Sequence, residues 1–188
     1  MDFFKLIKER RSIRNYKDKE IPLDVIKEIL NDCVMAPNGR NRQAWRFIVI
    51  NSMDFMKKIT DSRVKRMLED LEKNPDSPFK EIEARIRSGE FRPFYNAPAL
   101  ILILGPDDIP VLPIDCAILS GYFMLSAAAR GLGTCFAYSG MSIDDTDISS
   151  EIDIPEGYQI FGSLILGYPK EIPPMPPRNE PVILKVIS

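Results

Sequence analysis

The sequence contains no histidine among its 188 residues. Histidine is the side chain that most often serves as a general base near neutral pH, and it pairs with serine or cysteine in the common nucleophilic enzymes. It is also a common ligand of zinc and of haem iron. Its absence excludes a Ser–His or Cys–His enzyme, and we expect no metal site. If the protein is an enzyme, a bound cofactor is expected to carry the reactivity.

Cysteine is scarce as well. Cys33, Cys116 and Cys135 make an odd number, and no two of them are close enough in the sequence for a metal or redox motif. All three lie among apolar residues, which indicates buried thiols of a protein in the reducing cytoplasm. A signal peptide is not expected, because the charged residues 5–14 begin too early for an apolar core. The longest apolar stretch, residues 118–129, is too short and too interrupted by serine and glycine to span a membrane.

Charge of one sign is also missing. The 25 basic and 27 acidic residues give a net charge of −2, so no overall basic field attracts nucleic acid. Neither a GxGxxG motif after a strand nor a GxxxxGK[ST] motif occurs, so the two common nucleotide-binding fingerprints are absent. With 45% apolar residues and no internal repeat, the composition indicates one soluble domain over residues 1–188.

A basic cluster follows the first apolar stripe, which has helical spacing near the N-terminus. The residues with donor groups at this position are Arg10, Arg11, Ser12 and Arg14. Forked guanidinium donors beside a hydroxyl suit a phosphate group. Alternatively, the helix ends in basic residues because they complement its dipole and face water. Both interpretations remain open on this stretch alone.

A loop rich in amides and glycine occupies residues 36–45, between an expected helix that starts near Pro22 and an expected buried strand over residues 46–50. The side chains of Asn38, Asn41 and Gln43 both donate and accept hydrogen bonds, as recognition of the edge of a planar heterocycle requires. The simpler interpretation is that asparagine and glycine make a turn, which explains Asn41 and Gln43 less well.

The middle of the chain is the least regular part. Asp54 is expected to cap a helix, and a break at residues 74–78 precedes a charged segment. Residues 74–92 have two interpretations, a mobile flap over a site or a solvated helical surface.

The second half alternates strands and helices. We expect a strand over residues 96–104 ended by Gly105 and Pro106, and a helix over residues 114–130 that is apolar on every side. Such a helix lies either at the centre of the core or at a subunit interface. A short strand should lead into a loop at residues 138–140, where ligands bind in many α/β sheets.

The tail combines prolines with an apolar end. Residues 172–178 are expected to be extended by their prolines, and residues 182–187 form an apolar run typical of a strand. Such an arm often pairs with another subunit, because its own sheet would otherwise leave an edge exposed.

Three of these blocks together, residues 10–16, 36–47 and 128–135, resemble the nitroreductase family of FMN-dependent oxidoreductases. A fourth block, residues 166–169 with Arg178 beyond it, matches the C-terminal end of that family. The resemblance implies an α+β fold, with a mixed sheet flanked by helices. It also implies an intertwined homodimer with FMN at the interface and with residues 172–188 exchanged as an arm.

The resemblance also implies a set of cofactor contacts. The phosphate and ribityl part of FMN would be held by Arg10, Arg11, Ser12 and Arg14, with Arg178 adding to the phosphate contacts. The isoalloxazine would lie against Pro37, Asn38, Asn41 and Gln43, of which Pro37 and Asn38 could come from the other subunit. The flavin N5 side would face Ala137, Tyr138 and Ser139, which would offer backbone N–H groups.

The chain departs from the family pattern in three places. Tyr138 and Ser139 stand where many members have a small or acidic residue followed by glycine, Ala44 replaces a common proline, and Pro176 replaces a lysine of some members. These departures concern substrate preference more than FMN binding.

The implied activity is a ping-pong reaction in which NADH or NADPH reduces the flavin at N5 and the flavin reduces a small electrophile, such as a nitroaromatic or a quinone. No protein nucleophile is needed, and Tyr138 is a candidate proton donor. One alternative is a flavin-binding carrier or sensor without turnover. Another is a structural dimer module without a ligand, which leaves Arg10, Arg14 and Arg178 unexplained.

Overall fold

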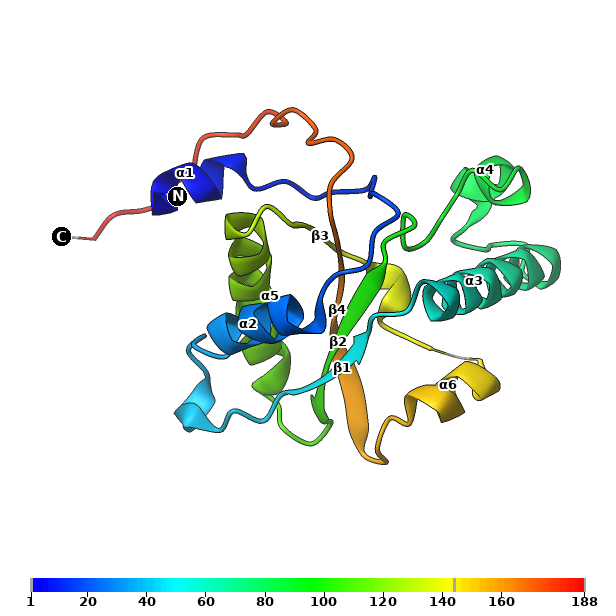
Figure 1. Ribbon diagram of the computed structural model, residues 1–188, viewed down its shortest axis with the longest axis horizontal. Helices are drawn as coiled ribbons and strands as arrows, with labels where there is room; N and C mark the ends of the chain where they lie inside the picture. The colour runs from blue at the N-terminus through cyan, green and yellow to red at the C-terminus, as the bar shows by residue number, and fades with distance from the viewer. Residues whose placement is uncertain (1, 144, 188) are drawn as a thin grey trace.

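A four-stranded sheet forms the centre of the computed structural model, which describes residues 2–143 and 145–187 (Figure 1). Met1 and Ser188, which belong to the expected domain and, for Ser188, to the expected arm, lie outside these residues. The strands are β1 (Arg46–Ile50), β2 (Ala99–Pro106), β3 (Gly133–Phe136) and β4 (Tyr158–Gly167). Their order is β1-β2-β4-β3, and every neighbouring pair is antiparallel. The mixed character that the resemblance implied rests on one isolated parallel bridge, between Ser12 and Thr134.

Within the described residues, six α-helices surround the sheet. They are α1 (Phe3–Glu9), α2 (Leu23–Cys33), α3 (Met53–Lys73), α4 (Glu83–Arg87), α5 (Leu112–Ala129) and α6 (Thr146–Ile152), with short 3₁₀ turns η1 (Gly39–Asn41), η2 (Lys80–Ile82) and η3 (Tyr138–Gly140). Helices cover both faces of the sheet, with α2 and α5 on one side and α3 and α6 on the other (Figure 1).

Strand β2 explains this three-layer arrangement. Side chains alternate between the two faces of a strand, so an unbroken run of leucine and isoleucine requires apolar cover on both sides. Ile101 and Ile103 pack in the cluster that contains α2 and α5, whereas Leu100 and Leu102 pack in the cluster that contains α3 and α6. The buried strand that the sequence predicted is therefore the middle of the core.

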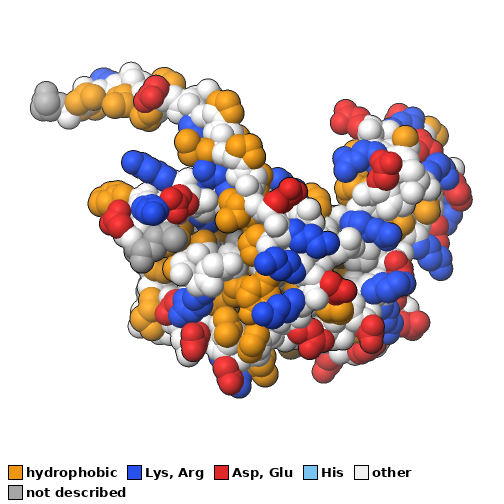
Figure 2. Space-filling model, turned by 45° about the horizontal axis from the view of Figure 1, so that its top comes forward, with side chains coloured by type: hydrophobic (Ala, Val, Ile, Leu, Met, Phe, Trp, Pro, Cys, Tyr) orange, Lys and Arg blue, Asp and Glu red, His pale blue; other side chains and the backbone are white. Residues whose placement is uncertain are grey.

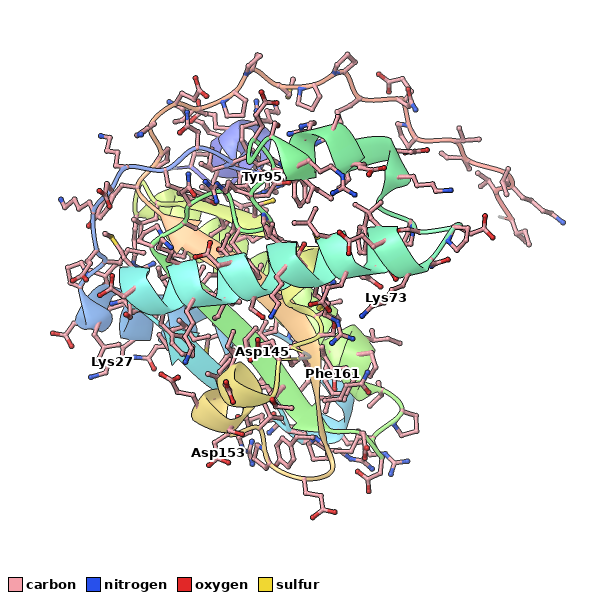
Figure 3. All side chains as sticks on the ribbon, turned by 90° about the vertical axis from the view of Figure 1, so that its right-hand side faces the viewer. Lys27, Lys73, Tyr95, Asp145, Asp153 and Phe161 are labelled. Carbon is pink, nitrogen blue, oxygen red and sulfur yellow. The ribbon has the colours of Figure 1, made fainter. Side chains whose placement is uncertain are left out.

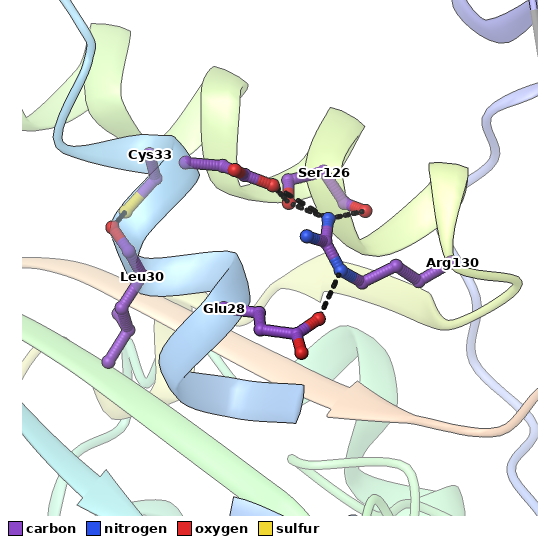
Figure 4. Close-up of polar contacts among 6 residues, drawn as sticks. Glu28, Leu30, Cys33, Ser126 and Arg130 are labelled. Atoms are coloured by element: carbon purple, nitrogen blue, oxygen red, sulfur yellow. Dashed lines mark hydrogen bonds and ion pairs between the residues drawn. The ribbon is translucent and has the colours of Figure 1, made fainter. Parts of the chain in front are cut away.

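Helix α5 packs tightly against α2. At its C-terminal end, the Arg130 guanidinium contacts Glu28 and Asp32 of α2, and the Ser126 hydroxyl also donates to Asp32 (Figure 4). The Ser126 hydroxyl, followed by Arg130, holds the pKa of the Asp32 carboxyl below its ordinary value.

One stripe of α5 is not covered. By length and composition this 18-residue helix could cross a membrane, but 39% of it is buried against the sheet and α2. Ile114, Ile118 and Tyr122 nevertheless remain 61%, 39% and 42% exposed. They are four residues apart and therefore lie on one face. Helix α5 is thus apolar on every side because one side packs in the core and another side is apolar but exposed.

Two expected boundaries are wrong in detail. Helix α3 is capped by the Ser52 hydroxyl, which accepts from the Phe55 N–H at 3.3 Å, and Asp54 lies in the first turn instead. Strand β2 continues through Gly105 and Pro106, which pair with β4. A Cβ at Gly105 would lie 2.4 Å from a methyl carbon of Leu112, so glycine is needed there because α5 approaches closely.

Within residues 74–92, η2 and α4 form a short helical surface over residues 80–87, as one of the two interpretations expected, and turns flank it. Ile86 of α4 is 2% exposed, and α4 packs against α3.

The three cysteines are buried free thiols, and burial raises the pKa of Cys33 and of Cys116 to about 12.

The tail from Glu171 onward contains no helix or strand among the described residues. It projects from the body with hydrophobic side chains along it (Figure 2). Val182, Ile183 and Leu184 are 84%, 73% and 94% exposed. The apolar run is therefore unpaired within a single chain.

Candidate functional site

Residues 10–14, here called the arginine segment, run along the free edge of β3. The Ile13 N–H donates to the Thr134 carbonyl at 2.9 Å, and a Cβ at Gly133 would lie 2.5 Å from Ile13, so glycine permits this close approach. Ile13 is 3% exposed. Because side chains alternate along an extended segment, Ser12 and Arg14 lie on the side opposite Ile13.

The next residue of β3, Cys135, lies beside this segment. Burial raises the pKa of the Cys135 thiol, while the Arg14 charge and the Ser12 hydroxyl, both adjacent to the sulfur, act in the opposite direction. A thiol in this environment stays protonated near neutral pH and serves as a packing group under Ser12 and Arg14.

Two arginine nitrogens of the segment are buried without a partner. A cavity of about 170 Å³ is lined by Arg10 and Arg11 together with parts of α1, the end of α5, β3 and the start of the tail. Arg10 Nη1 and Arg11 Nε have no hydrogen-bond partner among the described residues, although Arg11 Nη1 donates to the backbone carbonyls of Lys8 and Arg10. Buried donors are almost always satisfied in native proteins. The donor set and the cavity therefore fit an anionic group such as a phosphate.

Arg14 has a different environment. Its side chain is exposed, and its guanidinium carbon lies 5.8 Å from the ring centroid of Tyr95, at the end of the connection that follows α4. Tyr95 lies on the side of α3 that carries α4 (Figure 3). No carboxylate forms an ion pair with Arg14 in the described parts of the chain.

The turn that follows β3 is rigid. The Ala137 N–H donates to the Ser163 carbonyl at 2.8 Å, so this donor is already used. A Cβ at Gly140 would lie only 2.1 Å from Ser163 Oγ. Glycine is therefore needed at this position, because η3 packs closely against β4. Tyr138 is 82% exposed, and the N–H groups of Tyr138 and Ser139, at the start of η3, donate to no group within the described residues.

The loop at residues 36–45, here called the amide loop, is held mainly by its own side chains. Asn38 Oδ1 accepts from the Gln43 N–H at 3.0 Å, and Gln43 Nε2 donates to Asn41 Oδ1 at 3.1 Å. The Gly39 N–H donates to Asp115 of α5 at 3.0 Å. Arg40, Asn41 and Gln43 all have positive φ values, from 48° to 56°. The turn interpretation therefore explains Asn38, whereas Asn41 Nδ2 and Gln43 Oε1 still have capacity for a ligand.

A single chain brings only part of the expected site together. The arginine segment and the turn at residues 137–139 both adjoin β3, at one edge of the sheet. The loop that carries Pro37, Asn38, Asn41 and Gln43 leads into β1 at the opposite edge, far from α1 in Figure 1. Arg178 is exposed in the tail. Among the residues that the structure describes, it makes no hydrogen bond or ion pair with the arginine segment.

Sequence reasoning missed two aromatic residues, Phe94 and Tyr95, which contact η3 and Arg14 respectively. Tyr95 and Asn96 have φ values of 53° and 56°. Asparagine is a recognised signal for this left-handed conformation, but an aromatic residue is not. Asn96 was therefore the only readable sign of the turn.

Comparisons with known proteins agree with this architecture. The model of the family described as the nitroreductase family matches residues 7–168. A protein of Methanothermobacter thermautotrophicus named a putative NADH dehydrogenase/NAD(P)H nitroreductase is 28% identical, over 92% of this chain and 80% of its own length. An iodotyrosine deiodinase of Thermotoga neapolitana is 27% identical, over 96% of this chain and 95% of its own length.

The fold has solved counterparts. A nitroreductase of Bacteroides fragilis, described with bound FMN, superposes with a TM-score of 0.80 at 23% identity, and the match covers all of both chains. At that identity the likeness shows the fold. Taken with the match of the family model over most of the sequence, it establishes that this chain belongs to the nitroreductase family.

Proposed function

We propose that this protein is an FMN-dependent oxidoreductase that uses NADH or NADPH to reduce a small electrophile, such as a nitroaromatic or a quinone. The observation that carries the proposal is the pair of unpartnered guanidinium nitrogens, Arg10 Nη1 and Arg11 Nε, at a cavity beside β3. The FMN described in the B. fragilis relative supports the choice of ligand, because its phosphate needs such donors.

The residues have distinct roles in this proposal. Arg10 and Arg11 would neutralise the phosphate, and Ser12 and Arg14 would bind the adjoining ribityl chain. Bound FMN would supply the redox chemistry, taking two electrons and a proton from the reduced nicotinamide and passing them to the acceptor. The free N–H groups of Tyr138 and Ser139 would hydrogen-bond the flavin edge, and the exposed Tyr138 hydroxyl could deliver a proton to the acceptor.

We further propose that the complete site needs a second copy of the chain. Three observations support this: the amide loop lies at the sheet edge opposite the arginine segment, α5 has an open apolar stripe, and the tail ends in an unpaired apolar run. The loop with Pro37, Asn38, Asn41 and Gln43 would then face the flavin held by the other copy. Arg178 would reach the phosphate once its tail is ordered by the partner.

The arm itself has a matching surface. Strand β1 is an edge strand, and an open groove of about 490 Å³ runs along it, lined by Ile48, Val49, Ile50 and Phe55 among others. Residues 182–187 would add to this edge as a strand. Their backbone would hydrogen-bond to the unpaired backbone groups of β1, and their apolar side chains would fill the groove.

A second candidate activity is reductive removal of iodide from an iodinated phenol. It is favoured by the name of the T. neapolitana relative, which matches nearly the full length of both chains. Iodide release from 3-iodotyrosine under anaerobic conditions, compared with nitroaromatic reduction by the same preparation, would separate the two acceptor classes.

The test is the visible absorption spectrum of the purified protein before and after anaerobic addition of NADH or NADPH. A flavin spectrum that bleaches within seconds is expected, and the faster nucleotide identifies the donor. A flavin that stays oxidised would instead support a carrier or sensor. A colourless protein that does not take up added FMN would contradict the proposal.

A further inference from the structure

One short turn, residues 92–97, contacts both parts of the site that adjoin β3. Phe94 is 1% exposed, and its Cε1 lies 3.2 Å from the position that a Cβ on Gly140 would occupy, so its ring packs on η3. The ring of the next residue, Tyr95, faces the Arg14 guanidinium. Two neighbouring aromatic side chains thus link η3 to the arginine segment.

The backbone of this turn fixes the direction of Tyr95. Tyr95 and Asn96 both have left-handed φ values, 53° and 56°. The buried residues Phe94 and Ala97, 1% and 3% exposed, anchor the turn on both sides. An aromatic residue keeps a left-handed conformation only where the surrounding structure holds it there. The direction in which the Tyr95 side chain leaves the backbone is therefore set by the fold.

Arg14 has few other groups to orient it. It has no ion-pair partner among the described residues, and the nearby Tyr16 hydroxyl is already used, since it donates to the Ile13 carbonyl at 2.7 Å. Another neighbour is the protonated Cys135 thiol, which is a weak hydrogen-bonding group. A free arginine side chain loses considerable rotamer freedom when it binds a ligand, so a ring that holds it in advance lowers this cost.

We propose that Tyr95 is a positioning residue of the FMN site, whose ring holds the Arg14 guanidinium ready for the ribityl and phosphate part of the cofactor. The turn at residues 92–97 thereby contributes to cofactor affinity, because it carries Tyr95. The inference rests on the proposed FMN-dependent function. It assigns a role to a residue that does not itself need to contact the flavin.

The experiment measures FMN dissociation from the holoprotein by the recovery of flavin fluorescence on dilution. Tyr95→Asn removes the ring but suits a left-handed backbone, and it should raise the dissociation constant about two- to fivefold, as loss of an exposed cation–π contact does. Tyr95→Phe keeps the ring and should restore wild-type affinity. Phe91→Asn is the matched control, because it removes a ring that faces Arg85 at a similar distance, 5.9 Å, in the same segment.

A double-mutant cycle separates positioning from a general loss of structure. In an Arg14→Ala background, Tyr95→Asn should have no further effect on FMN affinity. An undiminished effect there, a failure of Tyr95→Phe to restore binding, or unchanged affinity in Tyr95→Asn would overturn the assignment while leaving the proposed function intact. If Tyr95→Asn does not fold, wild-type affinity in Tyr95→Phe and weakened binding in Tyr95→Leu give the same decision. A wild-type protein that does not bind FMN would instead refute the proposed function.

Discussion

Arg10 and Arg11 should affect the stability of the free protein and its affinity for an anionic ligand in opposite ways. Arg10 Nη1 and Arg11 Nε are buried without partners in the single chain, and an unsatisfied buried donor costs about 1–3 kcal/mol. The same donors would be satisfied by an anionic ligand. Stability without the ligand and affinity for it should therefore respond in opposite directions to one substitution.

Arg10→Met tests this opposition. Methionine keeps the unbranched stem but removes the buried donor, so the free energy of unfolding without FMN should stay the same or rise by about 1 kcal/mol, while FMN affinity falls at least about tenfold. Denaturant unfolding with and without FMN measures both quantities. Lys8→Met is the control, since Lys8 is an exposed basic residue that does not line the cavity. A parallel loss of stability and affinity would contradict the assignment.

Arg14→Ala should weaken FMN binding by about 2 kcal/mol, the contribution of a charged hydrogen bond. Stability without FMN should change little, because Arg14 is exposed and makes no ion pair in the described structure. Calorimetric titration of the FMN-free protein measures the difference. Unchanged affinity would remove Arg14 from the site.

The sequence allowed these residues to be predicted because their donors are contiguous. Arg10, Arg11 and Arg14 lie within five positions, and local spacing alone indicates a cluster. Tyr95 could not be found in this way, because it is 81 positions from Arg14 in the sequence and meets it only through the packing of the turn at residues 92–97.

At the scale of the secondary-structure elements, the contact between α2 and α5 should contribute to the free energy of unfolding in a way that depends on pH. The pKa of Asp32 is lowered from 3.8, chiefly by the Ser126 hydroxyl and then by Arg130. A lowered pKa in the folded state gives stability that is fully present above pH 3.8 and is lost as the pH falls through the folded value.

Asp32→Asn should therefore cost less than about 1 kcal/mol at pH 7, as expected for a pair that is half exposed to solvent. The difference between wild type and variant should shrink below pH 3.8. Urea unfolding at pH 7 and at pH 3 measures it. Asp24→Asn, at an exposed carboxylate of the same helix, is the control. A difference that grows as the pH falls would show that the sign is wrong.

Most helices and strands followed from hydrophobic pattern, whereas their ends depended on tertiary contacts. The buried run of β2 was readable, but its continuation through Pro106 was not, since pairing with Tyr158 of β4 decides it. The cap of α3 was misplaced by two residues because Ser52 and Asp54 both have capping side chains, and only the geometry distinguishes them.

For the whole molecule, the order of the strands separates the two groups of residues that the proposed site would combine, and this separation could not be predicted from the sequence. The order of strands puts the amide loop and the arginine segment at opposite edges, and no spacing along the chain reveals that order. The family resemblance supplied a second subunit as the explanation. The exposed stripe of α5 and the unpaired tail are the surfaces that the proposed second subunit would cover.

Ile118→Arg tests the shared site. A charge in the exposed stripe of α5 should convert dimers to single chains and release FMN in the same step, because the loop at residues 37–43 would no longer reach the other copy's flavin. Light scattering during gel filtration measures the mass, and absorbance at flavin wavelengths measures the cofactor. Ala84→Arg, on the exposed surface of α4, is the control. Single chains that keep FMN fully bound would show that one copy completes the site.

The length of the proline-rich tail would also decide which face of its final strand points inward. Four of the six residues at positions 172–177 are proline, so this stretch behaves as a stiff spacer of about 3.1 Å per residue rather than as slack. In a strand added at an edge, each side chain's face alternates with its position. In such a strand Val182, Leu184 and Val186 would share one face, and Ile183, Lys185 and Ile187 the other. Removal of one spacer residue would therefore exchange the two faces and turn Lys185 toward the groove, whereas removal of two would shorten the reach but keep the wholly apolar face inward. Spacer length in this protein should accordingly tolerate even changes better than odd ones.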